Sequence, residues 1–179
     1  GDVYKRQALE NDLEIVAALN KIDLPAAEPE ACASEIEQVL GIPADEILRL
    51  SAKTGEGVLE LLDWVVDRVP PPSGNIDSPL QALIFDSHYD QYRGVVSSIR
   101  VMNGELSSDS KLYFMQVGKS SGVEEIGIRK PDATPVGRLS AGEVGYLIAG
   151  IKDVGDARAG ETITELQTKA ETPLEGYRE

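Results

Sequence analysis

The chain has 179 residues, of which 41% are hydrophobic and 27% charged, and a net charge of −14. This charge excludes a protein that holds RNA or DNA mainly by its own positive surface, because phosphate neutralisation by Lys and Arg normally supplies that attraction. No run approaches the ~20 apolar residues of a transmembrane helix and no signal peptide is seen, so we expect a cytoplasmic protein with at most peripheral membrane association.

The first seven residues are set apart from the fold. Residues 2–7 resemble the in-frame reading of a transposase end sequence that is used in preparing DNA libraries. The alternative is the end of a natural charged helix. We therefore exclude residues 1–7 from the fold prediction as a non-native leader.

Residues 8–69 predict alternating strands and helices, because continuous apolar runs alternate with apolar residues at helical spacing. Strands are expected over residues 13–19 and 46–50, and helices over residues 29–40 and 56–69. Pro29 opens the first helix and Gly41 stops it. This is the second half of a doubly wound α/β sheet, in which ligands bind beyond the carboxyl ends of the strands.

A first motif, Asn-Lys-Ile-Asp, comes directly after the first predicted strand. The carboxylate of Asp23 can accept both the N1–H and the N2 amino donor of guanine, where adenine offers an acceptor. Asn20 bridges loop groups or contacts the base, and the aliphatic stem of Lys21 lies along the purine face. The alternative is an ordinary polar loop between a strand and a helix.

A second motif, Ser-Ala-Lys, follows the second predicted strand and so lies at the same edge of the sheet. We expect Ser51 to fix the turn, the backbone N–H of Ala52 to point at the guanine O6, and Lys53 to cover the other face of the ring. The two motifs together indicate a site that binds the guanine of GTP or GDP, and they resemble the fourth and fifth nucleotide motifs of the GTPase superfamily.

The groups that handle phosphate are not found in this sequence. No segment fits Gly-x-x-x-x-Gly-Lys-Ser/Thr, and the run Gly118–Ser120 reads as the turn of a β-hairpin. There is also no Asp-x-x-Gly followed by His to place the attacking water, and no Thr loop to hold Mg²⁺. Because hydrolysis depends on those parts, we expect no catalytic or metal-binding residue here and no unaided GTP hydrolysis.

A Pro-rich linker over residues 70–78 separates this part from a second domain over residues 79–172. Short runs with β character are separated by turns, which is typical of a small closed antiparallel β-barrel. The strands are expected over residues 80–85, 94–101, 111–115, 123–128 and 143–148. Residues 173–179 begin the next linker or domain.

Three stretches of the second domain resemble elongation factor 4, the LepA family of translational GTPases. They are residues 79–96 (PLQALIFDSHYDQYRGVV), 141–146 (AGEVGY) and 151–163 (IKDVGDARAGETI). The resemblance covers residues 8–179 and implies a fragment made of the C-terminal half of the GTP-binding domain and domain II.

This resemblance carries expectations about the complete protein. It implies a ribosome-dependent GTPase that acts in translation or ribosome assembly, with Mg²⁺ held by residues that this fragment lacks. It also implies that the barrel contacts the small ribosomal subunit, with no DNA partner. A non-catalytic binding module with a vestigial nucleotide half and a TypA/BipA-type GTPase remain alternatives.

Other single residues have weaker functional interpretations. Four cations of the barrel are the local options for ribosomal RNA contact: Arg93, Arg129, Lys130 and Arg138. His88, the only histidine, has no Cys or His partner in the sequence, so we assign it a structural or contact role. Cys32, the only cysteine, cannot form an internal disulfide, and we expect it to pack within its helix interface.

Overall fold

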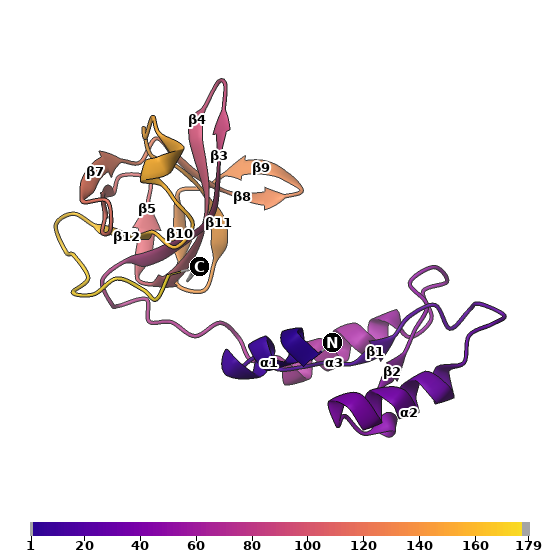
Figure 1. Ribbon diagram of the computed structural model, residues 1–179. Helices are drawn as coiled ribbons and strands as arrows, with labels where there is room; N and C mark the ends of the chain where they lie inside the picture. The colour runs from indigo at the N-terminus through magenta and orange to yellow at the C-terminus, as the bar shows by residue number, and fades with distance from the viewer. Residues whose placement is uncertain (1, 177–179) are drawn as a thin grey trace. The chain divides into compact units, whose positions relative to one another are not determined.

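The computed structural model describes residues 2–176, and the chain divides into two compact units between Pro70 and Pro71. Among the described residues, the first unit consists of helices and a pair of short strands. The second consists almost entirely of strands (Figure 1). The fold class expected from the sequence, an α/β part followed by an antiparallel β part, is confirmed.

Two parallel strands position the loops of the first unit. They are β1 (Ala18–Leu19) and β2 (Leu48–Arg49), with Ala18 opposite Leu48. The other elements of this unit are α1 (Asp2–Glu10), α2 (Pro29–Leu40), the short 3₁₀ helix η1 (Ala44–Glu46) and α3 (Val58–Arg68). Because β1 and β2 are parallel, the loops that follow them leave the sheet at one edge.

Both strands are shorter than the ranges 13–19 and 46–50 that the sequence predicts. A strand is defined by its ladder of hydrogen bonds, and within the described residues β1 and β2 pair only with each other. The Leu48 N–H donates to the Ala17 carbonyl over 3.2 Å, so the bonding continues slightly beyond the assigned strands. Residues 44–46 form η1 instead of extended chain.

The helix expected over residues 29–40 is confirmed as α2. Pro29 occupies its first position, and Gly41 ends it in the left-handed conformation with φ 68°. The Gly41 N–H donates to the Glu37 carbonyl over 2.9 Å. The second helix, α3, begins after Gly57, where a β-carbon would lie 2.3 Å from the Arg49 carbonyl oxygen, so this position requires glycine.

The expected packing of Cys32 is wrong, because its side chain is exposed and α2 buries Ala33 instead. A sheet of two short strands offers a narrow surface, so each helix covers it with few residues. The apolar side of α3 also faces solvent, with Leu59 76% and Val66 80% exposed. The first unit therefore has a small buried core beside a large unpartnered apolar surface.

The second unit is an antiparallel β structure that curls around a main apolar core (Figure 1), and Val96, Tyr146 and Ile148 form a second, smaller buried cluster. Its strands are β3 (Gln81–Asp90), β4 (Gly94–Asn103), β5 (Glu105–Ser107), β6 (Lys111–Phe114), β7 (Lys119–Gly122), β8 (Glu125–Lys130), β9 (Asp132–Pro135), β10 (Arg138–Ser140), β11 (Val144–Ile148) and β12 (Thr162–Glu165). Eight of them form one sheet in the order β7-β6-β12-β3-β4-β11-β8-β9, while β5 pairs with β10. The short 3₁₀ helix η2 (Val154–Asp156) precedes β12.

The core of this unit follows the alternation expected of half-buried strands. On β4 the inward residues include Ile99 and Val101, and they meet Phe114 of β6 and Ile163 of β12. Each of these four side chains is at most 1% exposed. This core is much larger than that of the first unit, so most of the chain's apolar burial lies here.

Each of the five strands expected in this unit is present, and five others were missed: β5, β7, β9, β10 and β12. The missed strands are three or four residues long and rich in Ser, Thr, Gly or charged residues. The strand β7, for example, is Lys-Ser-Ser-Gly, and it forms because all four residues pair with β6. Pairing with a neighbour, rather than local propensity, creates these strands.

Candidate guanine-nucleotide site

The two motifs singled out in the sequence lie side by side at the carboxyl edge of β1 and β2. The Ser51 hydroxyl donates to the Asp23 carboxylate over 2.7 Å, and the Ala52 N–H donates to the Asn20 side-chain oxygen over 3.0 Å. The backbone joins the loops as well, because the Ile22 N–H donates to the Leu50 carbonyl over 3.3 Å. Three hydrogen bonds thus tie the loop after β1 to the loop after β2.

Ser51 is the centre of the second loop. It is fully buried, and its hydroxyl accepts the Thr54 N–H over 3.2 Å while donating to Asp23. Its carbonyl accepts the Gly55 N–H over 2.8 Å, and its own N–H donates to the Glu56 carbonyl over 2.9 Å. The loop therefore closes on itself around this serine and fixes one oxygen of the Asp23 carboxylate.

Asn20 organises the first loop. Its side-chain oxygen accepts the Lys21 N–H over 2.7 Å as well as the Ala52 N–H. The sequence assigns the Ala52 N–H to the base carbonyl, and in this structure the same donor is engaged by Asn20. A guanine O6 placed there has to share or take over this hydrogen bond.

Lys21 has a left-handed backbone with φ 69°, one of two residues other than glycine with a positive φ in the described chain. This conformation costs a residue with a β-carbon about 1–2 kcal/mol. Strained backbone of this kind concentrates at ligand sites, where the surrounding structure holds it in place. Here the Asn20 oxygen on its N–H and the Leu24 N–H on its carbonyl, at 3.2 Å, hold the turn.

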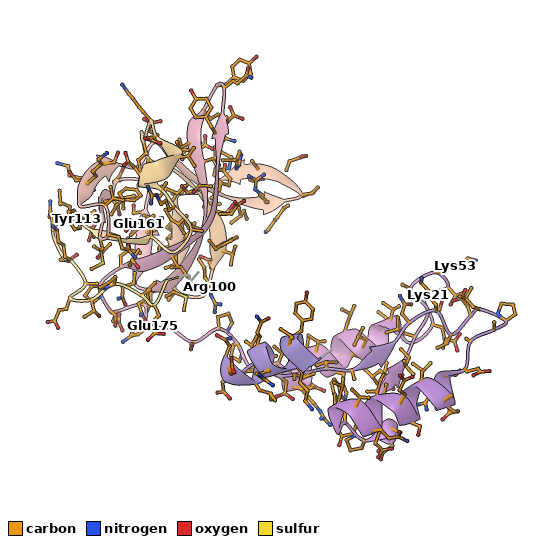
Figure 2. The ribbon with its side chains drawn as sticks, in the orientation of Figure 1. Lys21, Lys53, Arg100, Tyr113, Glu161 and Glu175 are labelled. Atoms are coloured by element: carbon orange, nitrogen blue, oxygen red, sulfur yellow. The ribbon has the colours of Figure 1, made fainter. Side chains whose placement is uncertain are left out.

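The two loops enclose a pocket of about 390 Å³ that opens at the sheet edge. Its lining residues are Asn20, Lys21, Asp23, Leu24, Ala52 and Lys53. Figure 2 shows Lys21 and Lys53 at the same end of the first unit, on the two loops. All six sequence-predicted residues are thus brought together: five of them line the pocket, and the buried Ser51 lies behind it and bonds to Asp23.

The pocket offers what a guanine ring needs. Asp23 brings a half-buried carboxylate with one oxygen oriented by Ser51, and a carboxylate is the acceptor that two adjacent N–H donors require. Two exposed lysines, Lys21 and Lys53, also border the space, and a lysine stem can lie along an apolar ring face. Leu24 is a lining residue that the sequence reasoning missed, although its place directly after Asp23 could have indicated it.

No group of three or more His, Cys, Asp or Glu side chains capable of holding a metal is found among residues 2–176. His88 lies on β3 opposite Val96 and is exposed. The run Gly118–Ser120 turns from β6 into β7 with Gly118 at φ 72°, the hairpin that the sequence predicts. Within the described part of the chain, no helix has both the length and the apolar character needed to span a membrane.

Comparison with known families divides the chain in the same way. The model of the elongation factor Tu GTP binding domain matches residues 3–71, and the model of elongation factor Tu domain 2 matches residues 94–164. The first match includes residues 3–7, which lie in α1. The origin of residues 1–7 as a non-native leader stays a prediction, as do the outer limits of the domains, and residues 177–179 lie outside the described chain.

The relatives with similar sequences are much longer than this chain, which spans less than a third of their length. It is 52% identical over 172 residues to elongation factor 4 of Gloeobacter violaceus and 53% identical to that of Prochlorococcus marinus. Elongation factor 4 of Staphylococcus haemolyticus is 50% identical over 171 residues. Each alignment covers 96% of this chain but only 28–29% of the relative.

Solved structures share the fold at lower identity. The chain matches a bacterial selenocysteine-specific elongation factor, EF-Sec, with a TM-score of 0.68 over 92% of this chain and 29% of that one. The match to elongation factor SelB from Methanococcus maripaludis has a TM-score of 0.71 and covers 91% and 36%. Both are 20% identical to this chain. The chain is therefore a homologue of elongation factor 4 that joins part of a translation-factor GTP-binding domain to a domain of the elongation factor Tu domain 2 type.

Proposed function

We propose that this chain is the guanine-reading and barrel portion of a ribosome-dependent GTPase of the elongation factor 4 type, which acts in the cytoplasm in translation or ribosome assembly. The observation that carries the proposal is the pair of cross-linked loops after β1 and β2. They bring the Asp23 carboxylate and the Ala52 N–H to one pocket, an acceptor for the two N–H donors of guanine and a donor that its O6 would take over from Asn20.

The residues present fit the base and not the phosphates. Asn20, Lys21 and Asp23 face the ring from the first loop, and Ala52 and Lys53 face it from the second, while Ser51 orients Asp23 from behind the pocket. Magnesium and phosphate binding belong to parts of the complete protein outside this sequence. When bound, Mg²⁺ and GTP supply the phosphoryl chemistry, while this chain selects the base.

The experiment is a change of base preference in the full-length protein. Replacement of Asp23 by Asn removes the double acceptor and supplies an amide that matches the O2 of xanthine. We expect Asp23→Asn to weaken GTP binding and strengthen xanthosine triphosphate binding, with the ratio of the two Kd values changing at least a hundredfold. An unchanged ratio would refute the role of Asp23, and Glu14→Gln, an exposed carboxylate before β1, is the matched control.

For the ribosomal partner, we propose that the barrel makes its contact through the turn between β3 and β4. The Asp90 carboxylate accepts the N–H groups of Tyr92 at 2.8 Å and Arg93 at 2.9 Å, and these bonds hold the pKa of Asp90 below its ordinary value. They fix a tight turn on which the Tyr92 ring is 96% exposed. An exposed ring on a rigid turn provides a stacking surface for an unpaired RNA base.

The four cations that the sequence suggests for contact with RNA phosphate differ in whether a neighbouring side chain already engages them. Arg93 pairs with Glu125, and Arg138 lies 3.7 Å from Glu105. The Arg129 guanidinium lies 5.9 Å from the Tyr146 ring centroid, and Lys130 beside it is exposed.

We expect Tyr92→Ala to weaken cosedimentation of the full-length protein with small subunits by about fivefold or more, since base stacking contributes about 1–3 kcal/mol. Phe85→Ala, a half-exposed ring elsewhere on β3, is the control.

A further inference from the structure

After β12 the chain turns back and lies against the outer side of the barrel, as the yellow loop in Figure 1 shows. We call residues 166–176 the strap. Ile163 of β12 points into the core, so its neighbours Thr162 and Thr164 point outward. Both threonines are nevertheless fully buried. Their hydroxyls accept N–H groups of the strap, Thr164 from Ala170 over 2.9 Å and Thr162 from Leu174 over 3.0 Å.

Other contacts hold the strap along its length. The Gln81 side-chain amide donates to the Thr172 carbonyl over 2.9 Å, and the Lys169 ammonium lies 3.3 Å from the centre of the Tyr113 ring. Near its end, Gly176 lies so close to Gly160 that a β-carbon would be 2.6 Å from the Gly160 carbonyl oxygen. The strap is thus seated by polar and ring contacts spaced about every second residue.

The strap contributes no residue to the buried apolar cluster of the barrel within the described chain. At its start, the Leu166 N–H donates to the Lys111 carbonyl of β6 over 2.7 Å and continues the ladder of β12. From Lys169 to Leu174 the contacts of the strap run through side chains of β12, β3 and β6. Segments held by few apolar contacts open at lower free energy than the core they lie on. The strap can therefore lift while the barrel stays folded.

The end of the strap also forms part of a pocket. Glu175 and Gly176 line a pocket of about 690 Å³ together with Gln116, Arg158 and Glu161 of the barrel. Figure 2 labels Glu161 and Glu175 on the barrel unit. Lifting of the strap removes one wall of this pocket and exposes the outer face of β12.

We propose that residues 166–176 are a latch that closes on β12 through the hydroxyls of Thr162 and Thr164 and opens as a unit from an intact barrel, opening the pocket with it. Valine keeps the branched shape of threonine but accepts no hydrogen bond. In Thr162→Val or Thr164→Val the closed strap would hold a half-buried N–H without its protein acceptor, and opening exposes this N–H fully to water. The substitution thus favours the open state.

The test is hydrogen exchange on the 179-residue chain. We expect the amides of Ala170 and Leu174 to exchange about tenfold faster or more in the double variant, with trypsin cleaving faster after Lys169, while the amides of β4 keep their protection. The control is Thr134→Val, an exposed threonine on β9. Unchanged strap exchange would overturn the proposal, and so would equal loss of protection in the strap and β4, since the strap would then open only with the whole barrel.

A second variant covers the case in which the valine substitutions prevent folding. Lys169→Gln removes the cation over Tyr113 from an exposed position and leaves β12 intact. We expect strap amides to exchange several-fold faster in this variant, with β4 unchanged. Equal strap exchange in Lys169→Gln and the unaltered chain would contradict the latch.

Discussion

The buried carboxylate of Glu161 gives the sharpest stability prediction. This residue is 3% exposed. One carboxylate oxygen accepts the N–H groups of Gln116 at 2.9 Å and Thr162 at 3.0 Å, and the other accepts the N–H of Val117 at 3.1 Å. Three backbone donors from two chain segments therefore meet one carboxylate, although the Thr162 N–H also donates to the Gln116 side-chain oxygen over 2.7 Å.

Glu161→Gln keeps the shape and changes the hydrogen bonding. In the better orientation the amide oxygen faces Gln116 and Thr162, and the NH₂ group faces the Val117 N–H, which loses its acceptor. The hydrogen bonds from Gln116 and Thr162 then go to a neutral acceptor, so the contribution of each to stability falls from about 1.5–3 to about 0.5–1.5 kcal/mol. The Val117 N–H, left without an acceptor, costs about 1–3 kcal/mol more. Allowing for the easier burial of a neutral amide, we expect a loss of about 2–4 kcal/mol in the free energy of unfolding of the barrel.

Two spectroscopic signals separate the units in a urea titration. Trp64 is the only tryptophan and lies in α3, so its fluorescence follows the first unit, while the far-ultraviolet β signal follows the barrel. A loss of this size shifts the barrel midpoint by about 0.7–4 M urea, since the slope is typically about 1–3 kcal/mol/M. The exposed Glu171→Gln is the control. A barrel midpoint that moves no more in Glu161→Gln than in this control would refute the reasoning.

Two further outcomes are expected from the same titrations. Lys21→Gly should raise the free energy of unfolding of the first unit by about 0.5–1 kcal/mol, because glycine relieves the left-handed backbone at φ 69°. A lower free energy of unfolding, followed by Trp64 fluorescence, would show that this backbone is unstrained. Burial and a 2.7 Å hydrogen bond to Glu125 raise the pKa of Tyr146 above 10.0. The protonated Tyr146 therefore stabilises the folded state. This contribution is fully present below the pKa that Tyr146 has in the unfolded chain, and it is lost as pH rises through its pKa in the folded chain. Barrel stability should therefore fall above about pH 10, and less steeply in Tyr146→Phe, and equal slopes in both proteins would contradict this.

The parts of the fold that the sequence predicts are those with local physical causes. Pro29 and Gly41 bound α2 because their backbone preferences act without any partner. The apolar run before Asn20 predicts a buried strand, but only its last two residues form β1 and neither of them is buried. Strand β7 has no such signal, and its pairing with β6 decides it. The exposure of Cys32 depends on how wide a sheet the helix covers, and helical spacing carries no information about that.

In the candidate site as well, the features with local causes could be predicted from the sequence and the others could not. The residue types after β1 and β2 indicate guanine chemistry, so the lining residues could be named in advance. The bond from Ser51 to Asp23 and the left-handed Lys21 depend on the meeting of two loops 28 residues apart, and no glycine at position 21 announces the turn. Glu161 reads in sequence as a polar turn residue, and only the fold brings three N–H groups to it.

The bond between the Asn20 side chain and the Ala52 N–H has a consequence for ligand exchange. In the proposed binding of guanine, its O6 replaces the Asn20 side-chain oxygen on the Ala52 N–H, and this N–H is not left without an acceptor. The loops are shaped in advance, and little ordering remains to be done when the ring arrives.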